Sequence, residues 1–185
     1  HGRAHVTHAE SAVTNDGKFL GFKNETIANL GAYARVFGTD TPTYLFGPCA
    51  TGVYTIPAAY SNVKAVYTNT APVDAYRGAG RPEATYTIER LVEKAAMELG
   101  IDKTEIRMKN FPSEFPFKQT LVHTVDSGDY VAGLEKAKQM ADYAGFDARR
   151  KKSEANGKLR GIGVSSYFEA CGIAPSAAVM SLGCG

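Results

Sequence analysis

The sequence predicts an α+β fold, in which a mixed sheet packs against helices. Two observations indicate this fold: residues 4–30 alternate as strands do, and residues 82–99 place apolar side chains at helical spacing. The composition agrees, since 44% of the 185 residues are hydrophobic and 22% are charged, as in ordinary globular chains. A chain of this length can form one domain, or one domain and part of another.

The first part of the chain predicts a β-hairpin. Residues 4–14 are rich in β-branched residues, and residues 18–30 resume the strand pattern after the turn signal Asn15-Asp16-Gly17. The side chains expected to share one face of the second strand are Leu20, Phe22 and Ala28. Further along, we expect a short helix near 42–50 and another strand over 62–68. The side chains expected on one face of that strand are Val63, Ala65 and Tyr67.

Residues 82–99 form the clearest helix in the sequence. Pro82 suits the first helical turn, and Gly100 is placed to end the helix. The apolar stripe of this helix consists of Ala84, Ile88, Leu91, Ala95 and Leu99. Asp102 then predicts the cap of a short second helix over 102–110.

The rest of the chain predicts a crossover, a third helix and a last strand. Phe and Pro residues favour a crossover over 111–125, and a domain boundary within 112–127. A helix is expected over 129–143, with one side formed by Tyr130, Leu134, Ala137 and Ala141. The basic run 149–152 is interpreted as a solvated helix face. The strand expected over 159–168 has one face formed by Ile162, Val164 and Phe168.

Charge and cysteine content exclude several classes of function. The net charge of +2 is too small to indicate a nucleic acid or an anionic membrane as partner, and no run of about 18 apolar residues predicts a membrane span. The three cysteines are too far apart for a disulfide framework or a zinc pattern, which favours a cytoplasmic setting; they are Cys49, Cys171 and Cys184. His1, His5 and His8 are interpreted as surface or packed histidines, with a metal site as the alternative.

The loop Ala75–Arg81 is the best candidate site on residues alone. Its glycines let the backbone approach a ligand, and the helix that follows offers unpaired N–H groups to an anion. Arg77 and Arg81 add guanidinium groups that match phosphate geometry. The loop is not the dinucleotide fingerprint, because Glu83 occupies the third glycine position. Two interpretations stay open: a site for an anionic ligand, or a plain turn before a helix.

Three smaller features carry less chemistry. His123 is isolated in the sequence, and no catalytic triad can be argued from spacing. The stretch Glu169-Ala170-Cys171-Gly172 is a pocket-lining turn or a plain one. Cys49 and Cys171 are expected to be small core residues rather than nucleophiles.

The run AYRGAGRPEATYTIERLVEKAAMELGID resembles the molybdenum-binding large subunit of the xanthine oxidase family. The stretches HAESAVTNDGKFLGFKNETIANLGAY, GVYTIPAAYSNVKAVYTNTAPVDAYRGAGRPEA and RGIGVSSYFEACGIAPS resemble the aerobic carbon monoxide dehydrogenase large chains of that family. The resemblance covers essentially the whole chain and implies an internal fragment of such a subunit. Residues 1–120 would be part of a first molybdopterin-binding domain, and 121–185 would begin the second.

The resemblance implies a cofactor and partners. The cofactor would be a molybdenum–molybdopterin cytosine dinucleotide, contacted by Ala75, Tyr76, Arg77, Gly78 and Ala79. The substrate pocket would be lined by Gly78, Ala79, Gly80 and Arg81, with Arg77 as the catalytic residue that orients the substrate. Electrons would pass to 2Fe-2S clusters on a small subunit and to FAD on a medium subunit, in a dimer of heterotrimers. The general-base glutamate of the family is expected outside this chain.

Two departures from the family pattern bear on the substrate. Carbon monoxide dehydrogenases read AYRCSFR, where the cysteine binds a copper; Gly78 has no thiolate, so copper is not expected and the loop resembles the form II group. Purine-oxidising relatives place a phenylalanine where this chain has Ala79. A small aldehyde or N-heterocycle is therefore the expected substrate. The alternatives are a genuine carbon monoxide dehydrogenase, and a stand-alone module that binds an anion or phosphate.

Overall fold

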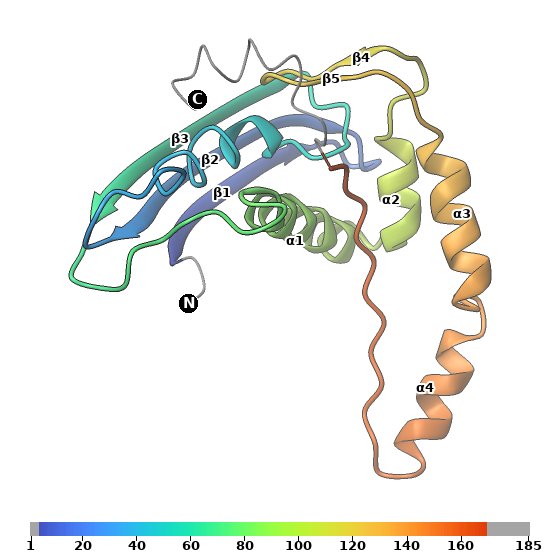
Figure 1. Ribbon diagram of the computed structural model, residues 1–185. Helices are drawn as coiled ribbons and strands as arrows, with labels where there is room; N and C mark the ends of the chain where they lie inside the picture. The colour runs from blue at the N-terminus through green and yellow to red at the C-terminus, as the bar shows by residue number, and fades with distance from the viewer. Residues whose placement is uncertain (1–3, 170–185) are drawn as a thin grey trace.

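The computed structural model of the chain describes residues 4–169. A three-stranded sheet lies over a long helix, and two further helices project away from the sheet (Figure 1). The helices and strands, in order, are β1 (His5–Val13), β2 (Phe19–Gly31), the 3-10 helix η1 (Gly47–Cys49), β3 (Ala58–Tyr67), α1 (Arg81–Leu99), α2 (Lys103–Lys109), β4 (Phe117–Lys118), β5 (Thr124–Val125), α3 (Tyr130–Met140) and α4 (Phe146–Glu154). This arrangement confirms the α+β prediction.

The sheet begins with the predicted hairpin. β1 and β2 pair antiparallel across a turn in which Gly17 adopts a φ of 87°, a conformation that suits glycine. β3 then joins β2 in parallel, which makes the sheet mixed. It begins at Ala58, before the start of the predicted strand. The helix predicted over 42–50 is present only as the single turn η1, which contains Pro48.

The predicted buried faces of two strands need correction. On β2, Phe22 and Ala28 are buried as expected, but Leu20 is 47% exposed. An irregularity in the pairing of β1 with β2 at this end places Phe19 inside instead. On β3, Ala65 and Tyr67 are exposed and Val63 is half-buried. These side chains are exposed because α1 packs against β1 and not against β3. Among the helices of residues 4–169, only the short η1 contacts β3.

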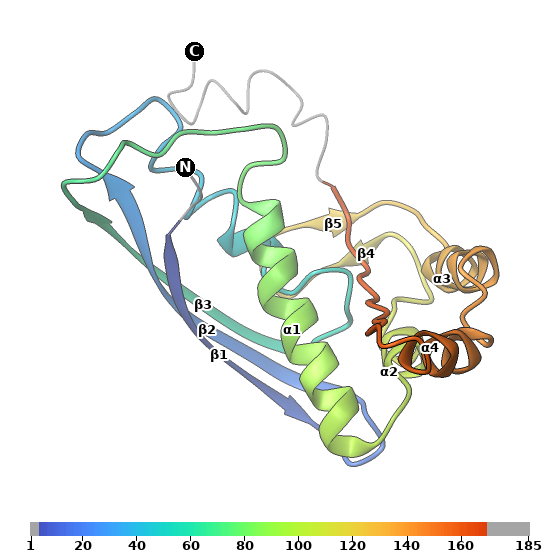
Figure 2. The same cartoon turned by 90° about the horizontal axis from the view of Figure 1, so that it is seen from below.

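α1 supplies the core beneath the sheet (Figure 2). Its predicted stripe is confirmed, with Ala84, Ile88 and Ala95 buried and Leu91 and Leu99 half-buried. Gly100 ends the helix in the left-handed conformation, at a φ of 66°. The principal apolar cluster combines side chains from the sheet with side chains from the helices. It includes Phe19, Phe22, Tyr54, Ile88, Val92, Ile106 and Phe111.

α2 is short and is fixed at both ends by side chains. As predicted, Asp102 caps it by accepting from the backbone N–H groups of Thr104 at 2.7 Å and Glu105 at 3.2 Å. At its other end, the buried Asn110 side chain donates to the carbonyl of Gly17 and accepts from the N–H of Phe19, both at 2.8 Å. Asn110 therefore fastens α2 to the β1–β2 turn.

The C-terminal helices differ from the sequence prediction in how much they bury. α3 begins at the predicted cap, where Asp129 accepts from the backbone N–H of Ala132. Of its predicted face, Leu134 is buried and Tyr130 half-buried, but Ala137 and Ala141 are exposed because α3 projects from the body of the molecule (Figure 1). The basic run 149–152 lies in α4, which has no buried residue, so its interpretation as a solvated helix face is confirmed.

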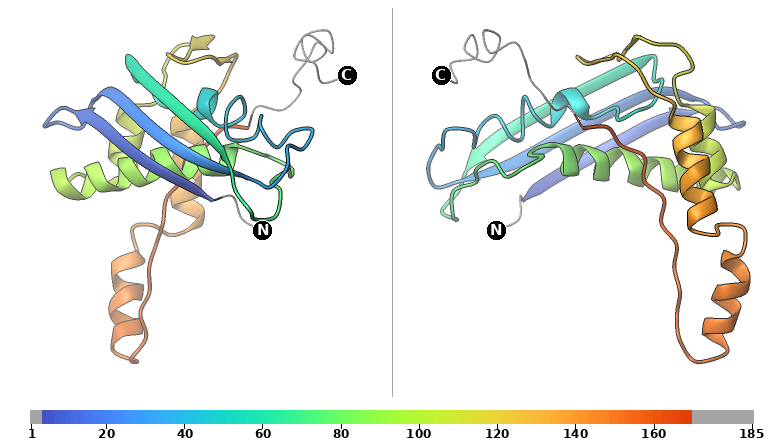
Figure 3. Two further views of the ribbon diagram at one scale, coloured as in Figure 1. Left: turned by 90° about the vertical axis from the view of Figure 1, so that its left-hand side faces the viewer. Right: turned by 45° about the vertical axis from the view of Figure 1, so that its right-hand side comes forward.

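The prediction of a strand over 159–168 is wrong in one respect, which is the pairing of the segment. The segment is extended, and its half-buried positions alternate as predicted, but it pairs with no strand among residues 4–169. Figure 3 shows it running back from α4 toward the sheet. Side chains of α2 donate to its carbonyls, at Ile162 from Lys103 and at Val164 from Arg107, where a strand would receive backbone N–H groups. In the described part of the chain, no helix is long and apolar enough to cross a membrane.

Candidate functional site

The loop Ala75–Arg81 forms two tight turns just before α1. The N–H of Ala79 donates to the carbonyl of Tyr76 at 2.8 Å, and the N–H of Arg81 donates to the carbonyl of Gly78 at 3.0 Å. Gly78 and Gly80 both adopt a positive φ, of 81° and 83°. Glycine adopts this conformation readily, so its choice at both positions has a local cause.

The two glycines of the loop have different surroundings. A Cβ at Gly80 would lie 2.4 Å from the carbonyl carbon of Leu45, so Gly80 lets the loop pack against that backbone. A Cβ at Gly78 would meet one described atom within 4 Å, the Oε2 of Glu169 at 3.7 Å. Gly80 is therefore required for packing, whereas Gly78 faces open space.

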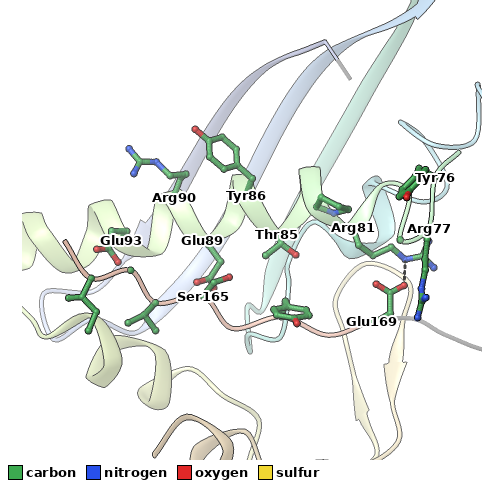
Figure 4. A pocket seen from close by; sticks show the side chains of 16 residues that line it. Tyr76, Arg77, Arg81, Thr85, Tyr86, Glu89, Arg90, Glu93, Ser165 and Glu169 are labelled. Atoms are coloured by element: carbon green, nitrogen blue, oxygen red, sulfur yellow. Dashed lines mark ion pairs between the residues drawn. The ribbon is translucent and has the colours of Figure 1, made fainter. Parts of the chain in front are cut away.

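That space is a cavity of about 1100 Å³ between α1, the loop and the extended segment 162–169 (Figure 4). Tyr76 and Arg77 line its loop end, and both are exposed, Tyr76 to 82%. Thr85 and Glu89 line it from α1, and Ser165 lines it from the extended segment. The sequence indicates the loop, and the structure adds the two walls formed by α1 and the extended segment.

The two arginines of the loop make different contacts. Nη1 of Arg81 donates to the carbonyl of Ala79 at 2.9 Å, and Nε of Arg81 lies 3.3 Å from Oε1 of Glu169. Its guanidinium is thus engaged within the loop and with Glu169, whereas Arg77 is exposed at the cavity. The start of α1 also disfavours an anion, because Pro82 lacks an N–H and Glu83 adds a negative charge in the first turn. The geometry does not favour a stand-alone phosphate site.

A cysteine and a histidine meet behind the loop. Sγ of Cys49 lies 3.4 Å from Nε2 of His123, and the His123 ring packs against that of Phe168. Burial raises the pKa of the Cys49 thiol to about 11, and burial together with the charge of Arg81 lowers the pKa of His123. Cys49 is therefore a neutral buried residue, as predicted. The pair joins positions 74 residues apart, and no sequence signal pointed to it.

Beneath the cavity, an ion pair in the core joins α1 to α2. The Arg107 side chain is 0% exposed, and its Nε and Nη2 donate to Oε2 of Glu89 at 3.0 and 2.9 Å. The hydroxyl of Tyr54 donates to the other carboxylate oxygen of Glu89. Burial, and then the charge of Glu89, raise the pKa of Tyr54 well above its usual value. This network was not apparent from the sequence.

The histidines of β1 do not come together. His5 and His8 lie on opposite faces of the strand, because side chains alternate along it. The His5 ring packs edge-on against Phe46, and Nε2 of His8 lies 2.9 Å from Oε1 of Glu10. Among residues 4–169, no group of three His, Cys, Asp or Glu side chains is arranged to hold a metal ion. The other predicted positions lie outside the described residues: His1, Ala170, Cys171, Gly172 and Cys184.

Comparison with protein families and curated proteins gives consistent matches. Residues 1–111 match the model of a family described as a molybdopterin cofactor-binding domain. The chain is 41% identical over 184 residues to the carbon monoxide dehydrogenase large chain of Hydrogenophaga pseudoflava, a match that covers 95% of this chain and 23% of that protein. It is 34% identical to subunit gamma of the 6-hydroxypseudooxynicotine dehydrogenase complex of Paenarthrobacter nicotinovorans, over 94% of this chain and 22% of that one. The chain spans less than a quarter of the length of these relatives.

A solved structure extends the likeness to three dimensions. The crystal structure of quinoline 2-oxidoreductase from Pseudomonas putida 86 matches with a TM-score of 0.80 and 31% sequence identity. The match covers 88% of this chain and 21% of that one. Fold and sequence therefore agree over most of the chain.

Proposed function

Since this chain belongs to the molybdopterin cofactor-binding domain family, we propose that it forms one wall of the cofactor site in a molybdenum-dependent oxidoreductase. The observation that carries this proposal is the position of the loop Ala75–Arg81. It lies within the part matched by the family model, and its residues Tyr76, Arg77, Gly78 and Arg81 line the large cavity. Because the chain spans less than a quarter of its relatives, the whole protein is expected to complete the site.

The residues at the loop fit such a cofactor. Gly78 presents bare backbone to the cavity. The cavity volume of about 1100 Å³ is sufficient for a dinucleotide-sized ligand. The exposed side chains of Tyr76 and Arg77 add an aromatic ring and a cation to the same wall. When bound, the molybdenum cofactor supplies the redox chemistry of the reaction.

The chain's own residues would bind and orient. We assign cofactor contact to Ala75–Gly78, mainly through their backbone groups, and the substrate side of the site to Gly78 and Arg81. Ala79 and Gly80, which the sequence also placed at the site, are buried and do not line the cavity. The guanidinium of Arg77 is exposed at the cavity, so it can donate to an anionic or carbonyl-bearing substrate. Arg81 instead holds the loop in shape, through Ala79 and Glu169.

The finer features of the whole protein belong to the same proposal. The cofactor would be the cytosine dinucleotide form, and electrons would leave to 2Fe-2S clusters and FAD on small and medium subunits, in a cytoplasmic dimer of heterotrimers. Within this chain, residues 1–120 would belong to a first molybdopterin-binding domain and 121–185 to a second. The extended segment within 121–185 already contributes to the cavity wall, which supports a site built from both parts.

We propose a small aldehyde or N-heterocycle as the substrate, as expected for a form II loop. Gly78 supplies no thiolate for copper, and Ala79 supplies no aromatic ring for a purine. Two of the relatives, quinoline 2-oxidoreductase and the 6-hydroxypseudooxynicotine dehydrogenase complex, carry N-heterocyclic compounds in their names, in keeping with this class. Carbon monoxide oxidation is the second candidate, and the 41% identity to a carbon monoxide dehydrogenase large chain favours it.

The test uses the complete purified enzyme. Its molybdenum and pterin content are measured first, and a preparation that binds neither contradicts the proposed function. Dye reduction is then followed with carbon monoxide, with aldehydes and with N-heterocycles. We expect turnover with an aldehyde or N-heterocycle and none with carbon monoxide. Turnover with carbon monoxide in a fully loaded enzyme would instead establish the second candidate and show that a thiolate at position 78 is dispensable.

A further inference from the structure

Glu169 joins two parts of the chain that lie far apart in the sequence. Its Oε1 lies 3.3 Å from Nε of Arg81, an ion pair drawn as a dashed line in Figure 4. The side chain of Arg81 is 12% exposed and that of Glu169 is 40% exposed, so water screens this pair only in part. An acidic residue of the extended segment is thus paired with the first residue of α1.

The same guanidinium reaches back to the loop. Nη1 of Arg81 donates to the carbonyl of Ala79 at 2.9 Å. Because the donors of a guanidinium have a fixed planar geometry, an ion pair that restrains the guanidinium of Arg81 also restrains the direction of the Ala79 carbonyl. The second carboxylate oxygen of Glu169 would lie 3.7 Å from a Cβ at Gly78. The Glu169 carboxylate therefore pairs with Arg81 at the end of the loop and lies beside Gly78 at its centre.

The segment that carries this carboxylate is itself anchored. Lys103 and Arg107 donate to the carbonyls of Ile162 and Val164, at 3.2 and 2.9 Å. Phe168, directly before the carboxylate residue, packs against both apolar clusters of the core. A side chain presented by an anchored backbone loses little further freedom when it pairs, so the pairing costs less conformational entropy.

We propose that Glu169 is a positioning residue for the cofactor-facing loop. Through its ion pair with Arg81, it fixes the Ala79 carbonyl and the backbone at Gly78 in the shape that meets the cofactor. This inference rests on the function proposed above and extends the site to a residue outside the family-matched residues 1–111.

The test compares variants of the complete molybdenum-containing enzyme. Glu169→Gln keeps the size of the side chain but removes its charge, and Glu169→Asp keeps the charge. Asp16→Asn is the matched control, because Asp16 forms an ion pair of 2.9 Å with the distant Lys109, beyond the other end of α1. Three properties are measured: hydrogen exchange of the peptide 75–81, the molybdenum EPR signal of the partly reduced enzyme, and kcat separately from KM.

For Glu169→Gln, we expect the Ala79 and Arg81 amides to exchange about tenfold faster, as loss of a charged partner in a half-buried pair implies. The EPR signal shifts and kcat falls, while molybdenum content is unchanged. Glu169→Asp restores most of the exchange protection and of kcat. Asp16→Asn leaves all three properties as in the unsubstituted enzyme.

Two results overturn the positioning role. Unchanged exchange and an unchanged EPR signal in a loaded Glu169→Gln enzyme would do so, with the proposed function intact. Equal damage from Glu169→Asp and Glu169→Gln would also do so, because charge would then not be the cause; this comparison decides the matter if Glu169→Gln does not load. If the unsubstituted enzyme contains no molybdenum or pterin, the proposed function fails, and exchange of the 75–81 peptide still tests the contact with Arg81.

Discussion

Gly78 and Gly80 are separated by one residue but are constrained differently. At Gly80, any side chain would collide with the backbone of Leu45, so the position is closed to substitution. At Gly78 the cavity leaves room, but the φ of 81° disfavours every other residue. A side chain at position 78 therefore either strains the loop backbone or requires the backbone to change.

Gly78→Cys in the complete enzyme is expected to give neither stoichiometric copper nor carbon monoxide oxidation. The side chain is strained by about 1–2 kcal/mol at this φ. The Glu169 carboxylate beside it also disfavours the thiolate that copper needs. Metal analysis after copper loading and carbon-monoxide-dependent dye reduction check this.

Gly163→Cys is the matched control for that variant. Gly163 lines the same cavity and has no positive φ, and a Cβ placed there would meet no described atom within 4 Å, so a cysteine fits without strain. Both variants should bind only incidental copper. Copper equal to molybdenum, with turnover, in Gly78→Cys but not in Gly163→Cys would contradict the prediction.

Among the elements, α2 depends most on its cap. Asp102→Ala removes the acceptor for the N–H groups of Thr104 and Glu105, which should cost about 1 kcal/mol. Amides of α2 should then exchange about fivefold faster in the complete protein. Hydrogen exchange resolved by peptide measures this.

The control for α2 is the corresponding cap of α3, Asp129→Ala, which should loosen α3 alone.

The effect at Asp102 should also depend on pH. Burial raises the pKa of Asp102, but hydrogen bonds from Thr104 outweigh it and the pKa is lowered overall. The cap therefore stabilises α2 fully above the ordinary pKa of an aspartate, and its contribution is lost as the pH falls through the lowered value. Equal hydrogen exchange of the α2 amides in Asp102→Ala and Asp129→Ala would contradict the assignment of Asp102 as the cap of α2.

Elements with local causes could be predicted from the sequence. The hairpin, α1 and the cap of α2 follow from turn residues, helical spacing and a capping side chain within a few residues. The exposed face of β3 and the unpaired extended segment could not be predicted, since both depend on which distant element lies against them. Periodicity shows that a segment has two faces, but not which one is covered.

The candidate site divides in the same way. The loop Ala75–Arg81 was identified because glycines, arginines and a helix start stand together in the sequence. The contact of Arg81 with Glu169 and that of Cys49 with His123 join distant segments, and no spacing rule connects them. The sequence thus indicates one wall of the cavity, whereas the residues that face this wall follow only from the fold.

At the scale of the whole molecule, Arg107 joins three segments. It donates from α2 to Glu89 of α1 and to the carbonyl of Val164 in the extended segment. Arg107→Met would leave the Glu89 carboxylate buried without its guanidinium, at a cost of about 3–5 kcal/mol. We expect faster hydrogen exchange in both α2 and 162–169 of the complete protein.

Two comparisons test that assignment. Adding Glu89→Leu to Arg107→Met should recover part of the lost stability, because no unpaired charge then remains in the core. Lys103→Met removes a more exposed pair with Glu93 and should cost much less. The absence of any recovery in the double variant would show that Arg107 acts by packing rather than by charge.

The free edge of β3 has a practical consequence for this chain. Within residues 4–169, β3 pairs on one side only, and Tyr60, Val66 and Tyr67 are exposed along it. Edges of this kind recruit strands from other molecules. Produced as a separate polypeptide, the chain should self-associate through this edge and precipitate as its concentration rises, so Val66→Lys would be the first change to make when preparing it for study in solution.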